Sequence, residues 1–318
     1  MTSNNYWFEN NEYKKEKREI VLGGFDTSTV GRDGYQLKNK TTSIKEENIV
    51  FFDWDDTAVP TTQFIKGINS KIIDIFRNNF PDVKGGEIFK ILEAAEKFSK
   101  QKQNIYKMER EIKFLCFVLK CLSTGSKRTV NKIIELANAE SLKIDDNALF
   151  YNEIKSILEK IYDAPVFNEI LYFIKNKPVS IKLGIFTFGD PVFQLNKIAR
   201  FLNKNPDIKI DYIWLTKILK SSFVKCILRG NYISDKQWII IDDSPPELLE
   251  LDFLAGNIEN GVKMVPIRSV RPNTKNENKK IGKDIRTFNF GNDSLKDTGF
   301  IKAISNIFTF QKKPTYVN

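Results

Sequence analysis

The pattern of apolar and polar positions changes sharply at about residue 48. Residues 1–47 are polar with mixed charge, and we expect an extension with little regular structure, packed in part through Tyr6, Trp7 and Phe8. Residues 49–52 then form a continuous apolar run, closed by the polar sequence Asp53-Trp54-Asp55-Asp56-Thr57. A short apolar run of this kind is typical of a parallel strand that is buried on both faces.

Residues 63–164 follow a helical period instead. Apolar residues recur there three or four positions apart, in stripes such as Ile68, Ile72, Ile75 and Phe76, or Ile112, Leu115, Leu119 and Leu122. Pro81, Gly85-Gly86 and Ser123-Thr124-Gly125 interrupt the pattern. We therefore predict an all-helical unit of several helices.

Strands and helices alternate from about residue 165 onward. The pattern predicts strands at 181–186, 210–215, 238–241 and 262–270, and helices at 191–203, 221–228 and 293–308. Asp190 and Pro191 suit the cap and the first turn of a helix. Such alternation predicts an α/β fold, a Rossmann-like three-layer parallel sheet built from residues 48–62 and 165–310, with the helical unit 63–164 inserted and a tail at 311–318.

Composition removes several kinds of chemistry. The chain has no histidine and three cysteines, Cys116, Cys121 and Cys226. Serine–histidine triads, cysteine–histidine pairs and histidine-based zinc or iron sites are therefore excluded. The sequence has neither an apolar stretch long enough to cross a membrane nor an apolar signal core, so we expect a cytoplasmic protein without a membrane partner.

The net charge of +10 is concentrated near the C-terminus. Residues 263–318 contain 12 basic and 4 acidic residues. A basic segment of this kind could bind nucleic acid or attract anionic substrates, and it could equally be a solvated, lysine-rich surface.

Polar clusters follow three of the predicted strands. They are Asp53 with Asp55, Thr187, and Asp242 with Asp243. Each cluster alone is typical of a turn, but the carboxyl ends of parallel strands meet at one edge of a sheet, where ligands bind. Two acidic pairs at one edge repel each other unless a cation lies between them. With oxygen ligands and no histidine, that cation is expected to be Mg²⁺.

The three clusters, in this order, resemble the motifs of the haloacid dehalogenase (HAD) superfamily. Ile49 to Thr57 is similar to its first motif, Asp-x-Asp-x-Thr after a strand. Gly184 to Thr187 is similar to the second motif, and Trp238 to Asp243 to the fourth. The resemblance covers residues 48–62 and about 165–270, and the stretch from Thr187 to Gln194 also resembles uncharacterised bacterial members with a helical cap of the C1 type.

The resemblance implies a role for each matched residue. Asp53 would be the nucleophile that attacks phosphorus, and Asp55 would protonate the leaving oxygen and then activate water. Thr187 would donate a hydrogen bond to a phosphoryl oxygen. Asp53, the backbone carbonyl of Asp55, Asp242 and Asp243 would form the metal site, with Asp243 as a direct ligand.

The third motif of the superfamily is a lysine, which only its position identifies. The candidates are Lys217, Lys220, Lys225 and Lys236. We favour Lys220, because it precedes a predicted helix start and follows a strand, so that it can reach the strand ends.

Three further features bear on the activity within the superfamily. Family dehalogenases lack the second aspartate, so Asp55 favours a phosphatase or phosphomutase. Asp56 departs from the pattern, in which Gly or Asn is frequent. The helical insertion resembles a C1 cap, which closes over a site and restricts it to small substrates.

These observations predict a Mg²⁺-dependent phosphatase that hydrolyses a small phosphorylated substrate. Three alternatives stay open. The protein could be a phosphomutase, a nucleic-acid-associated phosphatase that uses the basic C-terminal segment, or an inactive HAD scaffold, although the intact acidic pairs argue against the last.

Overall fold

The computed structural model describes residues 25–29, 34–39, 47–100, 105–125, 128–139, 150–228, 236–257, 262–281, 285–290 and 297–309. Tyr6, Trp7, Phe8 and the predicted tail 311–318 lie outside these residues. The chain divides into two compact units, one of residues 1–62 and 165–318 and the other of residues 63–164. No helix in the described ranges is long and apolar enough to cross a membrane.

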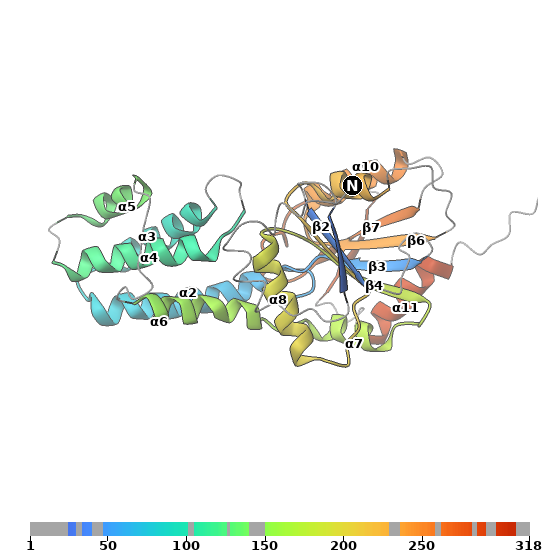
Figure 1. Cartoon of the computed structure of the whole chain (residues 1–318), viewed down its shortest axis with the longest axis horizontal. Coiled ribbons are helices and arrows are strands. Elements are labelled where there is room, and N and C mark those ends of the chain that lie inside the picture. The colour runs from blue at the N-terminus through green and yellow to red at the C-terminus, as the bar shows by residue number, and fades with distance from the viewer. Residues whose placement is uncertain are drawn as a thin grey trace, which may run out of the picture. The chain divides into compact units, whose positions relative to one another are not determined.

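The larger unit contains one sheet, whose described strands lie in the order β1-β2-β5-β4-β3-β6-β7-β8 (Figure 1). From β5 to β8 every neighbouring pair is parallel. Their bounds are β3 Asn48–Phe52, β4 Ile181–Phe188, β5 Tyr212–Thr216, β6 Gln237–Asp242, β7 Lys263–Val270 and β8 Arg286–Asn289. The predicted α/β fold with a parallel sheet and a helical insertion is confirmed, and β8 is a strand that the apolar pattern did not indicate.

Helices pack on both faces of this sheet. Phe51 lies in a core with α9 (Lys220–Ile227) and α10 (Pro245–Asn257). The next residue, Phe52, points the other way and meets Phe173 of α7 (Asn168–Asn176) and Phe300 of α11 (Asp297–Thr309). Successive side chains of a strand alternate between faces, so two adjacent phenylalanines anchor both helical layers of a three-layer fold.

The expectation of little regular structure before residue 48 is wrong for two segments. Strands β1 (Phe25–Thr29) and β2 (Gly34–Asn39) pair antiparallel, and β2 adds antiparallel to β5. Their sequences, FDTST and GYQLKN, are rich in polar and hydroxyl side chains. β2 pairs with the edge of β5 that faces away from β4, and an apolar pattern within residues 25–39 does not report such pairing.

The smaller unit is helical throughout its described residues. It contains most of α2 (Thr61–Asn79), then α3 (Gly85–Ser99), α4 (Met108–Ser123), α5 (Val130–Ala139), α6 (Tyr151–Leu158) and the 3₁₀ helix η3 (Glu159–Asp163). The predicted apolar stripes form its core: Ile72, Phe76, Ile91, Leu115 and Leu119 are fully buried or nearly so.

The packing of a β3 aromatic ring requires a glycine at one position of β4. The ring of Phe51 stacks on Trp214 with centroids 4.1 Å apart. A Cβ added to Gly184, on the neighbouring strand β4, would lie 2.2 Å from the Phe51 ring. Phe51 precedes Asp53 by two residues, so the absent side chain at position 184 helps to set the position of the strand that carries Asp53.

We expect Gly184→Ala to destabilise the protein by about 1–3 kcal/mol, since the added methyl group must displace a packed ring. The measurement is urea unfolding followed by tryptophan fluorescence. Gly256→Ala, in α10, is the matched control, because a Cβ there meets nothing within 4 Å. Equal stability of the two variants would contradict the packing constraint.

Candidate active site

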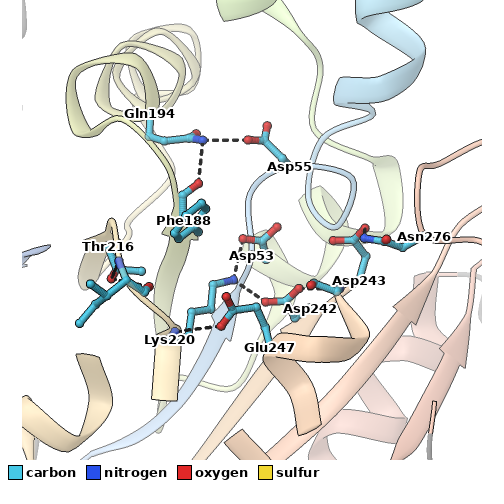
Figure 2. Close-up of polar contacts among 12 residues, drawn as sticks. Asp53, Asp55, Phe188, Gln194, Thr216, Lys220, Asp242, Asp243, Glu247 and Asn276 are labelled. Atoms are coloured by element: carbon cyan, nitrogen blue, oxygen red, sulfur yellow. Dashed lines mark hydrogen bonds and ion pairs between the residues drawn. The ribbon is translucent and has the colours of Figure 1, made fainter. Parts of the chain in front are cut away.

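Strand β3 lies between β4 and β6, so the residue that follows it lies at the centre of the sheet edge. The backbone N–H of Asp53 donates to the carbonyl of Ile241 at 2.8 Å, which extends the register of β3 and β6 by one residue. Asp53 therefore lies beside Asp242 and Asp243, and all three are buried (Figure 2). One carboxylate oxygen from each lies within 4.8 Å of the others.

Lys220, at the start of α9, is the cation nearest to this group in Figure 2. Its Nζ donates to Oδ1 of Asp53 at 2.7 Å and also to Oδ2 of Asp242. The backbone N–H of Lys220 donates to Glu247 of α10 at 2.8 Å, which fixes the helix start from which the lysine extends. Of the four candidate lysines, the favoured one is thus placed against the predicted nucleophile.

One ammonium group does not compensate for three buried carboxylates. Burial raises the pKa of Asp53 well above its usual range; Lys220 opposes this shift, and the charges of Asp242 and Asp243 add to it. Burial and the charge of Asp242 raise the pKa of Asp243 to about 7. Burial alone would lower the pKa of Lys220, but the two carboxylates beside it raise it.

The donor set fits a hard divalent cation. The three carboxylates supply oxygen ligands. The pKa values of Asp53 and Asp243 are raised by burial and by the neighbouring negative charge, and a bound cation would oppose both effects. Asp243 also accepts a hydrogen bond from the Asn276 side chain at 2.7 Å, and the Oδ1 of Asn276 has no partner among the described residues. Asn276 lies in the turn after β7 and carried no signal in the sequence.

Thr187 lies at the same edge, near the end of β4. It is 1% exposed, and its Oγ1 has no hydrogen-bond partner among the described residues. Buried hydroxyl groups are normally satisfied, so an unpartnered one at a strand end is suited to bind a ligand oxygen. The same holds for the buried hydroxyl of Thr57.

Asp55 lies in a different environment from Asp53. Its Oδ1 accepts hydrogen bonds from Thr61 at 2.5 Å and from the ammonium group of Lys197, and its Oδ2 accepts one from Gln194 at 2.8 Å. Burial would raise the pKa of Asp55, but the Lys197 charge and the three donors outweigh it and hold the pKa below its usual value. The side chain of Asp55 is not part of the three-carboxylate group; the expectation for the metal concerned its backbone carbonyl.

Helix α8 (Pro191–Lys204) carries Gln194 and Lys197, two residues for which the sequence predicted no role. A signal was present, because both are polar residues on a helical face whose other members, Phe193, Ile198 and Phe201, are buried. Thr61 carried no such signal.

Asp56 stands where the resembling family often has Gly or Asn, and the structure shows how an aspartate fits there. Its backbone φ of 57° lies in the left-handed region, which Gly, Asn and Asp adopt most readily. Its carboxylate accepts hydrogen bonds from the backbone N–H of Thr62 at 2.8 Å and from the Thr62 hydroxyl at 2.5 Å. The extra carboxylate therefore binds the first turn of α2.

Buried Arg271 binds the backbone of the loop that follows β3. Its Nε donates to the carbonyl of Thr57 at 2.8 Å, and Nη1 pairs with Glu169. The guanidinium lies between the rings of Phe167 and Phe290, 3.7 and 4.0 Å from their centroids. The loop from 53 to 59 is thus held by the sheet, by α2 and by Arg271.

The structure combines a parallel sheet with a helical insertion after β3. Acidic or hydroxyl side chains follow three of its strands at one edge. This is the arrangement that the motif resemblance predicted for the sheet edge. No family model matches the sequence, and no curated protein matches it. Solved structures similar to this chain include the following HAD proteins. A haloacid dehalogenase-like hydrolase from Xanthomonas campestris has 13% identity and a TM-score of 0.48, over 84% of this chain and 94% of that one.

The HAD-hydrolase YfnB from Bacillus subtilis, in a magnesium-bound crystal form, has 13% identity and a TM-score of 0.41, over 83% of this chain and 100% of that one. A 2-haloacid dehalogenase from Pseudomonas syringae has 14% identity and a TM-score of 0.40, over 70% and 86% of the two chains.

We expect Asp243→Asn to stabilise the metal-free protein by roughly 2–4 kcal/mol at pH 8 and by less than half of that at pH 5. The folded pKa of Asp243, about 7, lies above its value in an unfolded chain. The stability that this carboxyl contributes is therefore present in acid and lost as the pH rises through 7, whereas asparagine stays neutral.

The measurement is urea unfolding of both proteins in EDTA at pH 5 and pH 8, repeated with Mg²⁺. Added Mg²⁺ should stabilise the wild type and have much less effect on Asp243→Asn. A difference between the proteins that does not grow with pH would contradict this account of the carboxylate group.

Proposed function

We propose that the protein is a Mg²⁺-dependent phosphatase that hydrolyses a small phosphomonoester through an aspartyl-phosphate. The observation that carries this proposal is the position of Asp53. It is a buried carboxylate at the centre of the sheet edge, oriented by Lys220 and next to Asp242 and Asp243.

In the proposed reaction an oxygen of Asp53 attacks phosphorus, and the bond from phosphorus to the leaving oxygen breaks. In the free protein Lys197 and the neutral donors outweigh burial and hold the pKa of Asp55 low, and the negative charge of a bound phosphomonoester would raise it. Protonated Asp55 then gives its proton to the leaving oxygen, and the alcohol departs. Asp55 then takes a proton from water, which attacks phosphorus and breaks the bond to Asp53, releasing phosphate. The unpartnered hydroxyl of Thr187 donates to a phosphoryl oxygen, and Lys220 holds Asp53 in position.

Asp53, Asp242 and Asp243 would hold the Mg²⁺, together with the backbone carbonyl of Asp55. When bound, the ion would neutralise charge on the carboxylates and on the phosphoryl oxygens.

Asp55 favours phosphate-ester hydrolysis over dehalogenation. A halide leaves without a proton, so a dehalogenase does not need an acid beside its nucleophile. An alkoxide leaving group does need one, and a half-buried carboxylate held by several donors lies two residues from Asp53.

The helical unit is proposed as a cap. Its chain leaves the core after Thr62, which binds Asp56, and returns before Pro165. An inserted unit connected at the catalytic loop is suited to enclose a small substrate and exclude water.

We expect the purified protein to hydrolyse p-nitrophenyl phosphate with Mg²⁺ and not with EDTA, and Asp53→Asn to lose roughly 10³-fold or more of the activity. Asp252→Asn, an exposed aspartate on α10, is the matched control and should keep wild-type activity. The assay includes alkyl phosphates and a 2-haloacid.

Halide release without phosphate release would replace the proposal with a dehalogenase. A requirement for a bisphosphate activator would identify a phosphomutase. A folded wild type that turns over none of these compounds would refute the phosphatase.

A further inference from the structure

Helix α8 directs two buried polar side chains at Asp55. Gln194 and Lys197 are three residues apart, a spacing that places both on one face of a helix, and they are 3% and 2% exposed. Gln194 donates from one amide group both to Asp55 and to the carbonyl of Phe188, at 2.8 and 3.3 Å (Figure 2). Lys197 reaches the other oxygen of Asp55, which Thr61 also binds.

The turn between β4 and α8 is built so that these residues reach Asp55. Gly189 has a φ of +146°, and a Cβ there would lie 2.9 Å from Nε2 of Gln194, so a side chain would displace the amide. Asp190 caps α8 by accepting from the N–H groups of Val192 and Phe193. The helix start, and with it the direction of the two side chains, is therefore fixed by the residues just after Thr187.

A buried ammonium group is costly, and packing gives no reason for one at this position. A buried ion pair rarely adds stability over apolar residues of the same size, so its presence needs another explanation. The partner of Lys197 is the carboxylate proposed to move the proton. Proton transfer needs that carboxylate within hydrogen-bond reach of the leaving oxygen, and small displacements reduce the rate strongly.

We propose that Gln194 and Lys197 are positioning residues that hold both oxygens of Asp55 in the orientation for proton transfer to the leaving group. This inference rests on the proposed phosphatase function. It assigns α8 a role in the reaction that none of the matched motifs contains.

The first test compares leaving groups. p-Nitrophenolate departs without a proton, whereas an alkoxide needs one. In Lys197→Met, kcat/KM should therefore fall roughly tenfold or more further for an alkyl phosphate than for p-nitrophenyl phosphate, with the loss in kcat and not in KM. Asp55→Asn should show the same selectivity. Lys204→Met, an exposed lysine of the same helix, is the matched control and should leave both substrates unaffected.

The second test needs no turnover. Asp55→Asn leaves a buried ammonium group unpaired, so adding Lys197→Met should raise the urea midpoint of the double variant above that of Asp55→Asn alone. Strictly additive effects would show that the two residues are not paired and would overturn the proposal.

Equal losses on both phosphates would make Lys197 a merely structural residue, and this too would overturn the proposal. A wild type that hydrolyses neither phosphate would instead refute the phosphatase, and with it the role of α8 in proton transfer. The failures of the two proposals are thus distinguished by whether the wild type turns over.

Discussion

The contact of Lys220 with Asp53 and Asp242 holds the strand-end group together, and the rest of the site depends on it. Three carboxylates whose oxygens lie within 4.8 Å repel one another strongly once buried. A single ammonium group relieves part of that repulsion, and burial together with the remaining repulsion raises the pKa values of Asp53 and Asp243. The carboxylate group therefore lowers the stability of the metal-free protein, and a bound cation would restore it.

The surrounding fold serves to keep this group in place. Phe51 and Phe52 anchor β3 to helices on opposite faces of the sheet. The loop after β3 is tied to β6 through Asp53, to α2 through Asp56 and to Arg271 through Thr57. The position of Asp53 is therefore fixed by contacts with three separate parts of the fold, and such preorganisation is what the proposed reaction would require.

The parallel sheet and its strand ends were readable in the sequence because apolar runs and the polar residues after them are local signals. The positions of Asp53, Thr187 and Asp242 follow from strand order alone. Asn276 and Thr61 could not be found this way, because their contacts depend on how a turn and a helix start pack against distant residues. Strands β1 and β2 escaped prediction for a related reason, since their order comes from pairing with β5.

The two aspartates of the first motif show how burial alone fails to determine a carboxylate's behaviour. Asp53 shares its lysine with Asp242, so its charge is only partly balanced and its pKa rises. Asp55 has the ammonium group of Lys197 and two neutral donors, and its pKa falls. The positions of two buried lysines, one on α9 and one on α8, thus give two neighbouring carboxyl groups opposite pKa shifts.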